Sequence, residues 1–278
     1  MDKNGTIIKI ISNLYTVQSE DETYECRARG KFRNDKTTPL VGDFVVFDYK
    51  LKLIKEILPR KNMLDRPNVS NVDVALIVTS VKTPNLSLSL LDRQIAVITK
   101  SNIKPVICLT KCDLLNKEEI KDIENIFKYY ESIGIKVFKN TETDKLMNYL
   151  KDKIVVLTGQ TGAGKSSLIN RLGDLNLKTD EISMALGRGK HTTRHTEIHE
   201  VKDVLFVDTP GFSSLDLNTD KNDLKNYFIE FNKYTCKYKD CNHDKEDGCS
   251  VKNAVENNEI LKSRYDNYIK FRGELWWI

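Results

Sequence analysis

Apolar positions from residue 72 onward form short uninterrupted runs that alternate with longer amphipathic segments. The runs cover residues 72–79, 104–109, 135–138, 154–157 and 204–207. Segments 88–99 and 117–132 instead repeat apolar residues at helical spacing. Runs that are apolar on both faces are typical of strands buried in a parallel sheet, and amphipathic segments are typical of the helices that cover it. The pattern therefore predicts a doubly wound α/β domain.

The first 66 residues show a different pattern, in which β-rich segments are separated by turn residues. These segments cover residues 6–11, 14–17, 24–32, 43–49 and 51–58. Five short strands in this length predict a small β-barrel, and the oligonucleotide-binding fold is the natural candidate.

One of these segments carries an alternating row of cations. If residues 24–33 form a single strand, Arg27, Arg29, Lys31 and Arg33 share one face of it. Four positive charges in register are suited to a phosphate backbone, so we expect this face to contact RNA. A solvated outer face of the barrel is the alternative interpretation.

Composition narrows the class of protein. The chain has 278 residues, of which 40% are hydrophobic and 30% charged, and its net charge is +4. No apolar run approaches the ~18 residues that a membrane span requires. The first 20 residues also lack the basic and then apolar pattern of a signal peptide. We expect a cytoplasmic monomer with no membrane partner.

A glycine-rich loop directly follows the apolar run at 154–157 and precedes a helical pattern. The loop consists of Gly159, Gln160, Thr161, Gly162, Ala163, Gly164, Lys165, Ser166 and Ser167. Its glycines let backbone N–H groups point at phosphate oxygens at the start of a helix. Lys165 is predicted to reach the β- and γ-phosphates, and the Ser166 hydroxyl to bind Mg²⁺. A glycine-rich turn without a ligand is the alternative.

Two later segments complete a phosphate site. Asp208 follows the run at 204–207 and is predicted to hold Mg²⁺, while the Gly211 N–H is predicted to reach the γ-phosphate. The basic loop at 187–194 carries Thr192 and Thr193, and one of these hydroxyls is expected to join the Mg²⁺ shell while the γ-phosphate is present. A static surface turn is the other interpretation of this loop.

The segment Thr110, Lys111, Cys112, Asp113 follows the run at 104–109 and indicates which base is bound. A carboxylate at Asp113 accepts hydrogen bonds from N1–H and the N2 amine of guanine, whereas adenine presents an acceptor at N1. The sequence therefore predicts GTP. Most GTPases have Asn where this chain has Thr110, and the loop after Phe138, which should lie behind the base, departs from the usual Ser-Ala pair.

Three of the six cysteines lie close together near the C-terminus. Cys236, Cys241, His243 and Cys249 supply three thiolates and one imidazole, which is enough for a closed tetrahedral Zn²⁺ site with a structural role. Free cysteines beside a chance histidine are the alternative. Cys26, Cys108 and Cys112 are expected to be ordinary buried or near-buried thiols.

The order of the motifs is unusual, because the base motif ending at Asp113 precedes the phosphate loop at Gly159. The GTPase domain is therefore predicted to be circularly permuted. With CRARGKFR, NVSNVD, GRGKHTTRH and the terminal cysteines, the chain resembles the ribosome-small-subunit-dependent GTPase A family over essentially its whole length.

This resemblance implies a three-part organisation and a cellular role. The expected parts are an oligonucleotide-binding-type barrel at 1–66, a circularly permuted GTPase domain at 67–221, and an α-helical zinc-binding domain at 222–278. The implied activity is hydrolysis of GTP, with Mg²⁺, during late maturation of the small (30S) ribosomal subunit. The implied partners are GTP, GDP, the small subunit and its ribosomal RNA.

A catalytic residue is harder to identify, because Phe212 stands where many GTPases carry a Gln that orients the attacking water. A phenyl ring neither donates nor accepts a hydrogen bond, so we expect slow intrinsic hydrolysis. The missing group is then supplied by the basic loop or by the ribosome. His191 is the candidate in that loop, ahead of His195 at the start of the next strand, and RNA contact is its alternative role.

Two other functions fit parts of this sequence. One is a zinc-containing RNA-binding module for which GTP is only a conformational ligand. The other is a P-loop kinase of small molecules, which is disfavoured because Asp113 and the two-threonine loop have no role in it.

Overall fold

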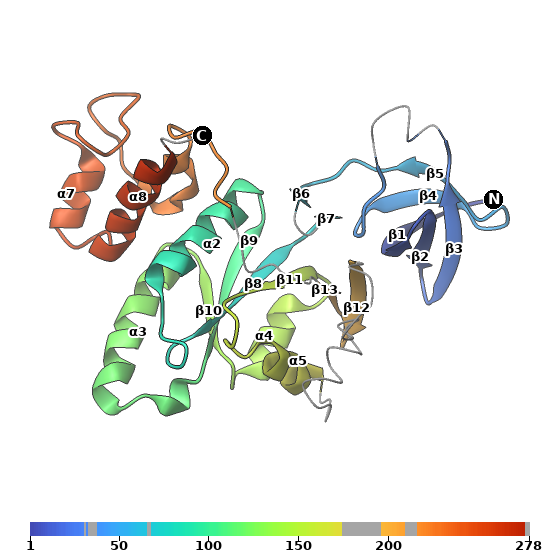
Figure 1. Cartoon of the computed structure of the whole chain (residues 1–278), viewed down its shortest axis with the longest axis horizontal. Helices are drawn as coiled ribbons and strands as arrows, with labels where there is room; N and C mark the ends of the chain where they lie inside the picture. The colour runs from blue at the N-terminus through green and yellow to red at the C-terminus, as the bar shows by residue number, and fades with distance from the viewer. Residues whose placement is uncertain (31, 33–37, 66–67, 174–195, 209–215, 276–278) are drawn as a thin grey trace.

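The computed structural model of the chain describes residues 1–30, 32, 38–65, 68–173, 196–208 and 216–275. Figure 1 shows a barrel of strands near the N-terminus, a central sheet with helices on both of its faces, and a helical part that contains the C-terminal residues. No helix of the described residues is long and apolar enough to cross a membrane.

The barrel is built from five strands, as the sequence predicts. They are β1 (Asp2–Ile11), β2 (Leu14–Ser19), β3 (Glu22–Ala28), β4 (Phe44–Asp48) and β5 (Leu53–Ile57). Antiparallel pairs join β1 to β2, β2 to β3, β4 to β5 and β1 to β4, and a short parallel pair joins β3 to β5. This closure buries Ile7, Val17 and Phe47 in the interior.

The structure corrects the prediction that four cations share one strand face, because β3 ends before Arg29. The strand stops at Ala28, where its pairing with β5 also ends, and the Phe32 N–H donates to the Arg29 carbonyl in a turn. Arg27 is therefore a strand residue, whereas Arg29 lies beyond the strand, because the chain enters a turn there. Lys31 and Arg33 lie outside the described residues.

The central part is doubly wound, as predicted. Its strands are β8 (Val74–Ser80), β9 (Lys104–Thr110), β10 (Lys136–Lys139), β11 (Ile154–Thr158), β12 (Glu197–Val201) and β13 (Val204–Asp208). Their order is β10-β9-β8-β11-β13-β12, and all neighbours are parallel except β12 and β13. The sheet thus places β8 between the strands that lead to the base motif and to the phosphate loop.

Two apolar clusters cover the faces of this sheet. One contains buried residues of α2 (Leu88–Lys100) and α3 (Lys117–Ser132), and the other contains buried residues of α4 (Thr143–Leu150) and α5 (Lys165–Gly173). The start of α3 follows from its sequence, since Asn116 and Glu119 form a capping box around its first turn.

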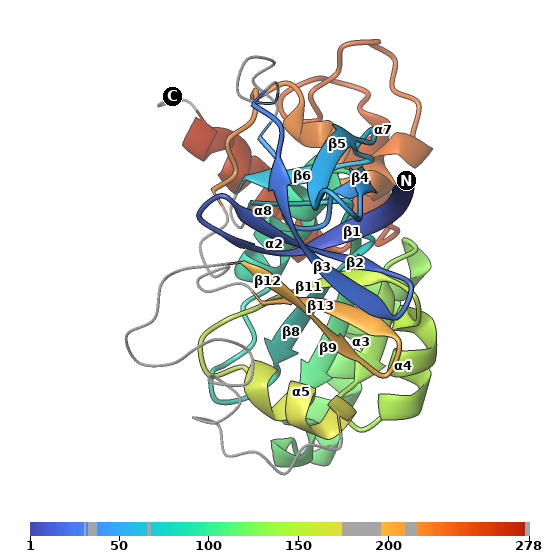
Figure 2. The ribbon, with the colours of Figure 1, turned by 90° about the vertical axis from the view of Figure 1, so that its right-hand side faces the viewer.

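The sheet continues from the central part into the barrel. Lys9 of β1 pairs with Glu197 of β12, and the Lys9 ammonium lies 2.9 Å from the Glu197 carboxylate. Figure 2 shows the first barrel strands directly beside β12. One sheet of eleven strands therefore includes both parts.

A buried carboxylate fixes the connection between the barrel and the sheet. Asp43 is fully buried and accepts from the Arg60 guanidinium at 2.7 and 2.8 Å and from the Ser70 hydroxyl at 2.6 Å. Ser70 belongs to the two-stranded unit of β6 (Met63–Asp65) and β7 (Asn68–Ser70). A charge paired in this way at a buried position restricts the connection to one geometry.

The C-terminal part contains η2 (Leu224–Tyr227), η3 (Ile229–Lys233), α7 (Ser250–Glu256) and α8 (Lys262–Glu274). Its apolar core includes Phe228, Phe231 and Tyr268, together with Ala96 and Val97 of α2. The C-terminal part is therefore packed directly on a helix of the central part.

Candidate nucleotide and metal sites

The phosphate loop spans the gap between the end of β11 at Thr158 and the start of α5 at Lys165. Gly159 has a φ of +136°, and a Cβ at this position would lie 2.1 Å from the Val78 carbonyl oxygen. Only glycine therefore lets the loop lie against β8. The N-terminus of α5 follows directly, and its free N–H groups and dipole favour an anion.

The side chain of Lys165 is folded over this loop. Its ammonium lies 2.6 Å from the Gly159 carbonyl and 2.9 Å from the Gln160 carbonyl. These bonds hold the positive charge within the curve of the loop, where a phosphate oxygen can replace a carbonyl as the acceptor. Ser166 stands next to it, half-buried, at the first turn of α5.

The base motif is bonded directly to the phosphate loop. The Thr110 hydroxyl donates to the Ala163 carbonyl at 2.6 Å, and the Lys111 ammonium donates to the Gly162 carbonyl at 2.9 Å. Lys111 has a φ of 60°, which turns the chain from the end of β9 into η1 (Cys112–Leu114). Thr110 thus makes the contact between the base motif and the phosphate loop, although most GTPases have Asn at this position.

Asp113 is exposed in η1, beside the loop that follows β10. A cavity of about 610 Å³ is lined by Asp113, Thr141 and Glu142 and by apolar side chains of α3 and β10. The loop is held in place because the Asn140 N–H donates to the Leu109 carbonyl, and Glu142 accepts from the Lys139 N–H. The structure therefore brings Asp113 and the segment 140–142 to one place, as the sequence predicts for a base pocket.

Several predicted site residues lie outside the described residues. They are His191, Thr192, Thr193 and Gly211, together with His195 and Phe212. Asp208 is the last residue of β13. Val207, the residue before it in the strand, pairs with Val156 of β11. The backbone at Asp208 thus reaches the same end of the sheet as the phosphate loop.

The four predicted metal ligands converge. Their ligand atoms all lie within 4.8 Å of one another, and Cys241, His243 and Cys249 are buried while Cys236 is half-buried. The His243 Nδ1 lies 3.4 to 3.5 Å from each of the three sulfur atoms. Burial lowers the pKa of His243, which keeps the imidazole neutral and able to bind a metal. The arrangement suits one tetrahedral ion with no open position.

Of the other cysteines, Cys26 and Cys108 are buried thiols, and Cys112 is half-buried. Burial raises the pKa of Cys26 to about 11 and that of Cys108 to about 12, so both remain protonated at neutral pH.

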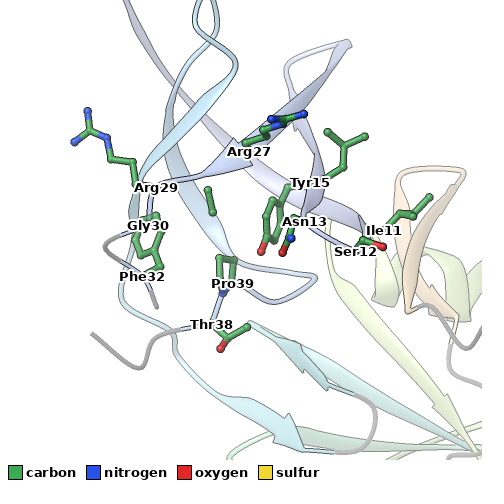
Figure 3. A pocket seen from close by; sticks show the side chains of 12 residues that line it. Ile11, Ser12, Asn13, Tyr15, Arg27, Arg29, Gly30, Phe32, Thr38 and Pro39 are labelled. Atoms are coloured by element: carbon green, nitrogen blue, oxygen red, sulfur yellow. The ribbon is translucent and has the colours of Figure 1, made fainter. Parts of the chain in front are cut away.

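The barrel carries a cavity beside its two described arginines. The cavity has a volume of about 830 Å³ and is lined by residues that include Asn13, Tyr15, Arg27, Phe32 and Pro39. Figure 3 shows the Arg27 side chain along one edge of it, whereas Arg29 points away from its centre. The sequence pattern gave no binding role to Tyr15 and Phe32, although both are aromatic residues of the predicted barrel segments 14–17 and 24–32.

Thr110→Val should weaken GTP binding about 10-fold, because it leaves the Ala163 carbonyl without its donor in a buried place. Thr110→Ser keeps a hydroxyl and serves as the matched control. Titration with a fluorescent GTP analogue measures both. Equal affinities in wild type and Thr110→Val would show that the two loops are held together by other contacts.

Cys241→Ser should abolish metal binding and lower the melting temperature of the C-terminal part, since a four-ligand site contributes to folding. Elemental analysis and thermal unfolding measure the two effects. Cys26→Ala, in the barrel core, should keep the metal. A wild-type protein that carries no bound metal would contradict the assignment.

Comparison with known proteins places the chain among GTPases of one family. Residues 57–218 match the sequence profile of the RsgA GTPase and residues 4–52 that of the RsgA N-terminal domain. The small ribosomal subunit biogenesis GTPase RsgA 2 of Oceanobacillus iheyensis is 45% identical over 98% of this chain and 97% of its own. RsgA of Latilactobacillus sakei is 45% identical over 98% and 96%.

Comparison with solved structures leads to the same family. YjeQ from Thermotoga maritima superimposes with a TM-score of 0.88 at 33% identity and covers 100% of both chains. YloQ, described as a circularly permuted GTPase, gives 0.83 at 35% identity and covers 99% of this chain and 95% of its own. The resemblance found in the sequence is thereby confirmed, and the chain belongs to the RsgA GTPase family.

Proposed function

We propose that this protein hydrolyses GTP during late maturation of the small (30S) ribosomal subunit, in the cytoplasm. The observation that carries the proposal is the bonding of the base motif to the phosphate loop through Thr110 and Lys111, which makes one nucleotide site. The ribosomal role is supported by relatives that are 45% identical over nearly the whole chain and are named for biogenesis of the small subunit.

Within this site, each group has a distinct role. Asp113 accepts from guanine, and Lys165 neutralises the β- and γ-phosphates. Mg²⁺ is held by Ser166, by Asp208 and by Thr192 or Thr193 while the γ-phosphate is present. The Gly211 N–H donates to that phosphate. When hydrolysis removes the γ-phosphate, these contacts are lost and the segments on either side of β12 and β13 are released.

Zinc is the metal that we assign to Cys236, Cys241, His243 and Cys249. A tetrahedral Zn²⁺ with Zn–S of ~2.3 Å and Zn–N of ~2.0 Å requires about 3.5 Å from nitrogen to sulfur and about 3.8 Å between sulfurs. The observed separations are 3.4 to 3.5 Å to nitrogen, and 3.9 Å between the sulfurs of Cys236 and Cys249. The role is structural, because all four positions are occupied by protein ligands.

Ribosomal RNA of the small subunit is the proposed macromolecular partner. On the barrel, the exposed Arg27 and Arg29 border a cavity with aromatic walls, a combination that suits phosphates and unpaired bases. On the C-terminal part, the exposed Tyr238 lies between Lys237 and Lys239, within the loop that joins two metal ligands. Lys31 and Arg33, predicted to extend the barrel surface, belong to the same proposal.

The alternative is an RNA-binding module in which GTP changes the conformation but is not hydrolysed as part of the cycle. Both functions use the same nucleotide site and the same RNA surfaces. They differ in whether the small subunit accelerates hydrolysis. Since Phe212 cannot orient water, we propose His191 for that role, once docking on the subunit has ordered the loop at 187–194.

Single-turnover hydrolysis of GTP should accelerate by orders of magnitude, about 100-fold or more, when purified small subunits are added. His191→Ala should remove this stimulation and leave nucleotide affinity unchanged, because the imidazole acts only on the attacking water. His195→Ala, in the same segment, should remain stimulated.

Two results would contradict the proposal at different levels. A wild-type protein that small subunits fail to stimulate would favour the alternative function. A fully stimulated His191→Ala would keep the GTPase function and transfer the water-orienting role to another group.

A further inference from the structure

Helix α2 lies between the C-terminal part and the central sheet, and each of its faces contacts one of them. Figure 1 shows α2 with α8 on one side and the strands of the sheet on the other. Ala96 and Val97 belong to the apolar core of the C-terminal part, whereas Leu91 and Ile95 belong to the core under the sheet. A shift of α2 therefore changes the packing of both the C-terminal part and the central sheet.

The face of α2 that contacts the C-terminal part is held by a buried ion cluster. Arg264 of α8 is completely buried and lies 2.7 Å from the Asp92 carboxylate of α2 and 2.5 Å from the Glu230 carboxylate of η3. The second oxygen of Asp92 accepts from the Asn267 amide at 2.6 Å. Both oxygens of one α2 side chain are thus bonded to α8.

Neutral donors complete this cluster, in which two carboxylates face one guanidinium. The Tyr130 hydroxyl donates to Asp92 at 2.7 Å, and the Tyr129 hydroxyl donates to Glu230 at 3.2 Å. Burial and then the Asp92 charge raise the pKa of Tyr130 well above its usual value, so this hydroxyl stays a donor. Such a cluster has one favourable geometry, because any displacement leaves a buried charge without its partner.

The opposite face of α2 is bonded to the strand that leads into the phosphate loop. Gln94 is buried, and its amide donates to the Thr158 hydroxyl at 3.2 Å. Thr158 is the last residue of β11 and directly precedes Gly159. The sheet-facing side of α2 is thus bonded to the residue from which the loop departs.

The segment that leads into α2 reaches both loops of the nucleotide site. The Thr83 carbonyl accepts from the Lys111 ammonium, and Pro84 is the nearest neighbour of Gly162 on the side where a Cβ would point. Ser87 then caps the helix by accepting from the Leu90 N–H. The N-terminal end of α2 is therefore fixed relative to the base motif and the phosphate loop.

We propose that Asp92 and Gln94 are positioning residues through which the seating of the C-terminal part on α2 sets the position of the phosphate loop. The inference rests on the proposed binding of guanine nucleotides and adds a regulation of that site. By linkage, a bound nucleotide strengthens the seating of α8 by the same factor by which that seating strengthens nucleotide binding. A partner that moves the C-terminal part will therefore change nucleotide affinity.

A double-mutant cycle tests this coupling. Gln94→Met keeps the volume of the side chain and removes its donor, and Asn267→Ala removes one donor from Asp92 without exposing a charge. Each should weaken binding of a fluorescent GDP analogue about 5-fold. The double variant should bind no more weakly than Gln94→Met alone, because the second change acts through the first contact.

Lys262→Ala is the matched control, since Lys262 lies on α8 but pairs with the exposed Asp266 of the same helix. It should leave the affinity unchanged. Metal content and melting temperature are measured for every variant, and Tyr130→Phe, which removes a single hydroxyl from the cluster, replaces Asn267→Ala if that variant fails to fold.

Hydrogen exchange supplies a readout that a purely structural role would not change. GDP should increase the protection of α8 amides in the wild type but not in Gln94→Met. Wild-type affinity in Asn267→Ala, or losses that multiply in the double variant, would overturn the coupling. Failure of the wild type to bind GDP would instead overturn the proposed function.

Discussion

The hydrogen bond from the Thr110 hydroxyl to the Ala163 carbonyl joins the two halves of the nucleotide site. These halves leave the sheet from β9 and β11, which are separated by β8, so sheet pairing alone does not bring them into contact. The close approach of Gly159 to the Val78 carbonyl lays the phosphate loop over the end of β8, which allows the loop to meet Thr110 and Lys111. A base and its phosphates can then be bound as one ligand.

Circular permutation leaves this arrangement intact but changes what is attached to it. The strand β12 pairs with β1 of the barrel, so the sheet that carries Asp208 continues into the barrel that carries Arg27. On the other side, α2 is clamped to α8 by Asp92 and Arg264. The nucleotide site therefore lies between the barrel and the C-terminal part, the two parts that we propose to bind RNA, and specific contacts connect it to each.

The sequence predicted the features that depend on local pattern. The alternation of buried strands and helices, the five-stranded barrel, the order of the motifs and the convergence of Cys236, Cys241, His243 and Cys249 follow from residue types and spacing. The extension of the third barrel strand to Arg33 was wrong, because alternation continues past Ala28 in the sequence while the pairing with β5 ends there. Asp92, Gln94 and Asp43 were missed, because their partners are distant in the chain and only tertiary packing brings them together. Polar residues between the apolar positions of the predicted helix at 88–99 were the available signal for Asp92 and Gln94.

The nucleotide selectivity of the Asp113→Asn variant is the most direct test of the claim that these loops form one guanine site. Affinities for GTP and for xanthosine triphosphate are compared in the wild type and the variant by competition against a fluorescent nucleotide. The amide of Asn can donate to the C2 carbonyl of xanthine where the carboxylate accepted from guanine, so GTP affinity should fall at least about 10-fold and xanthosine triphosphate should become the preferred ligand. Equal preference for GTP in both proteins would contradict the account, because Asp113 would then not face the base.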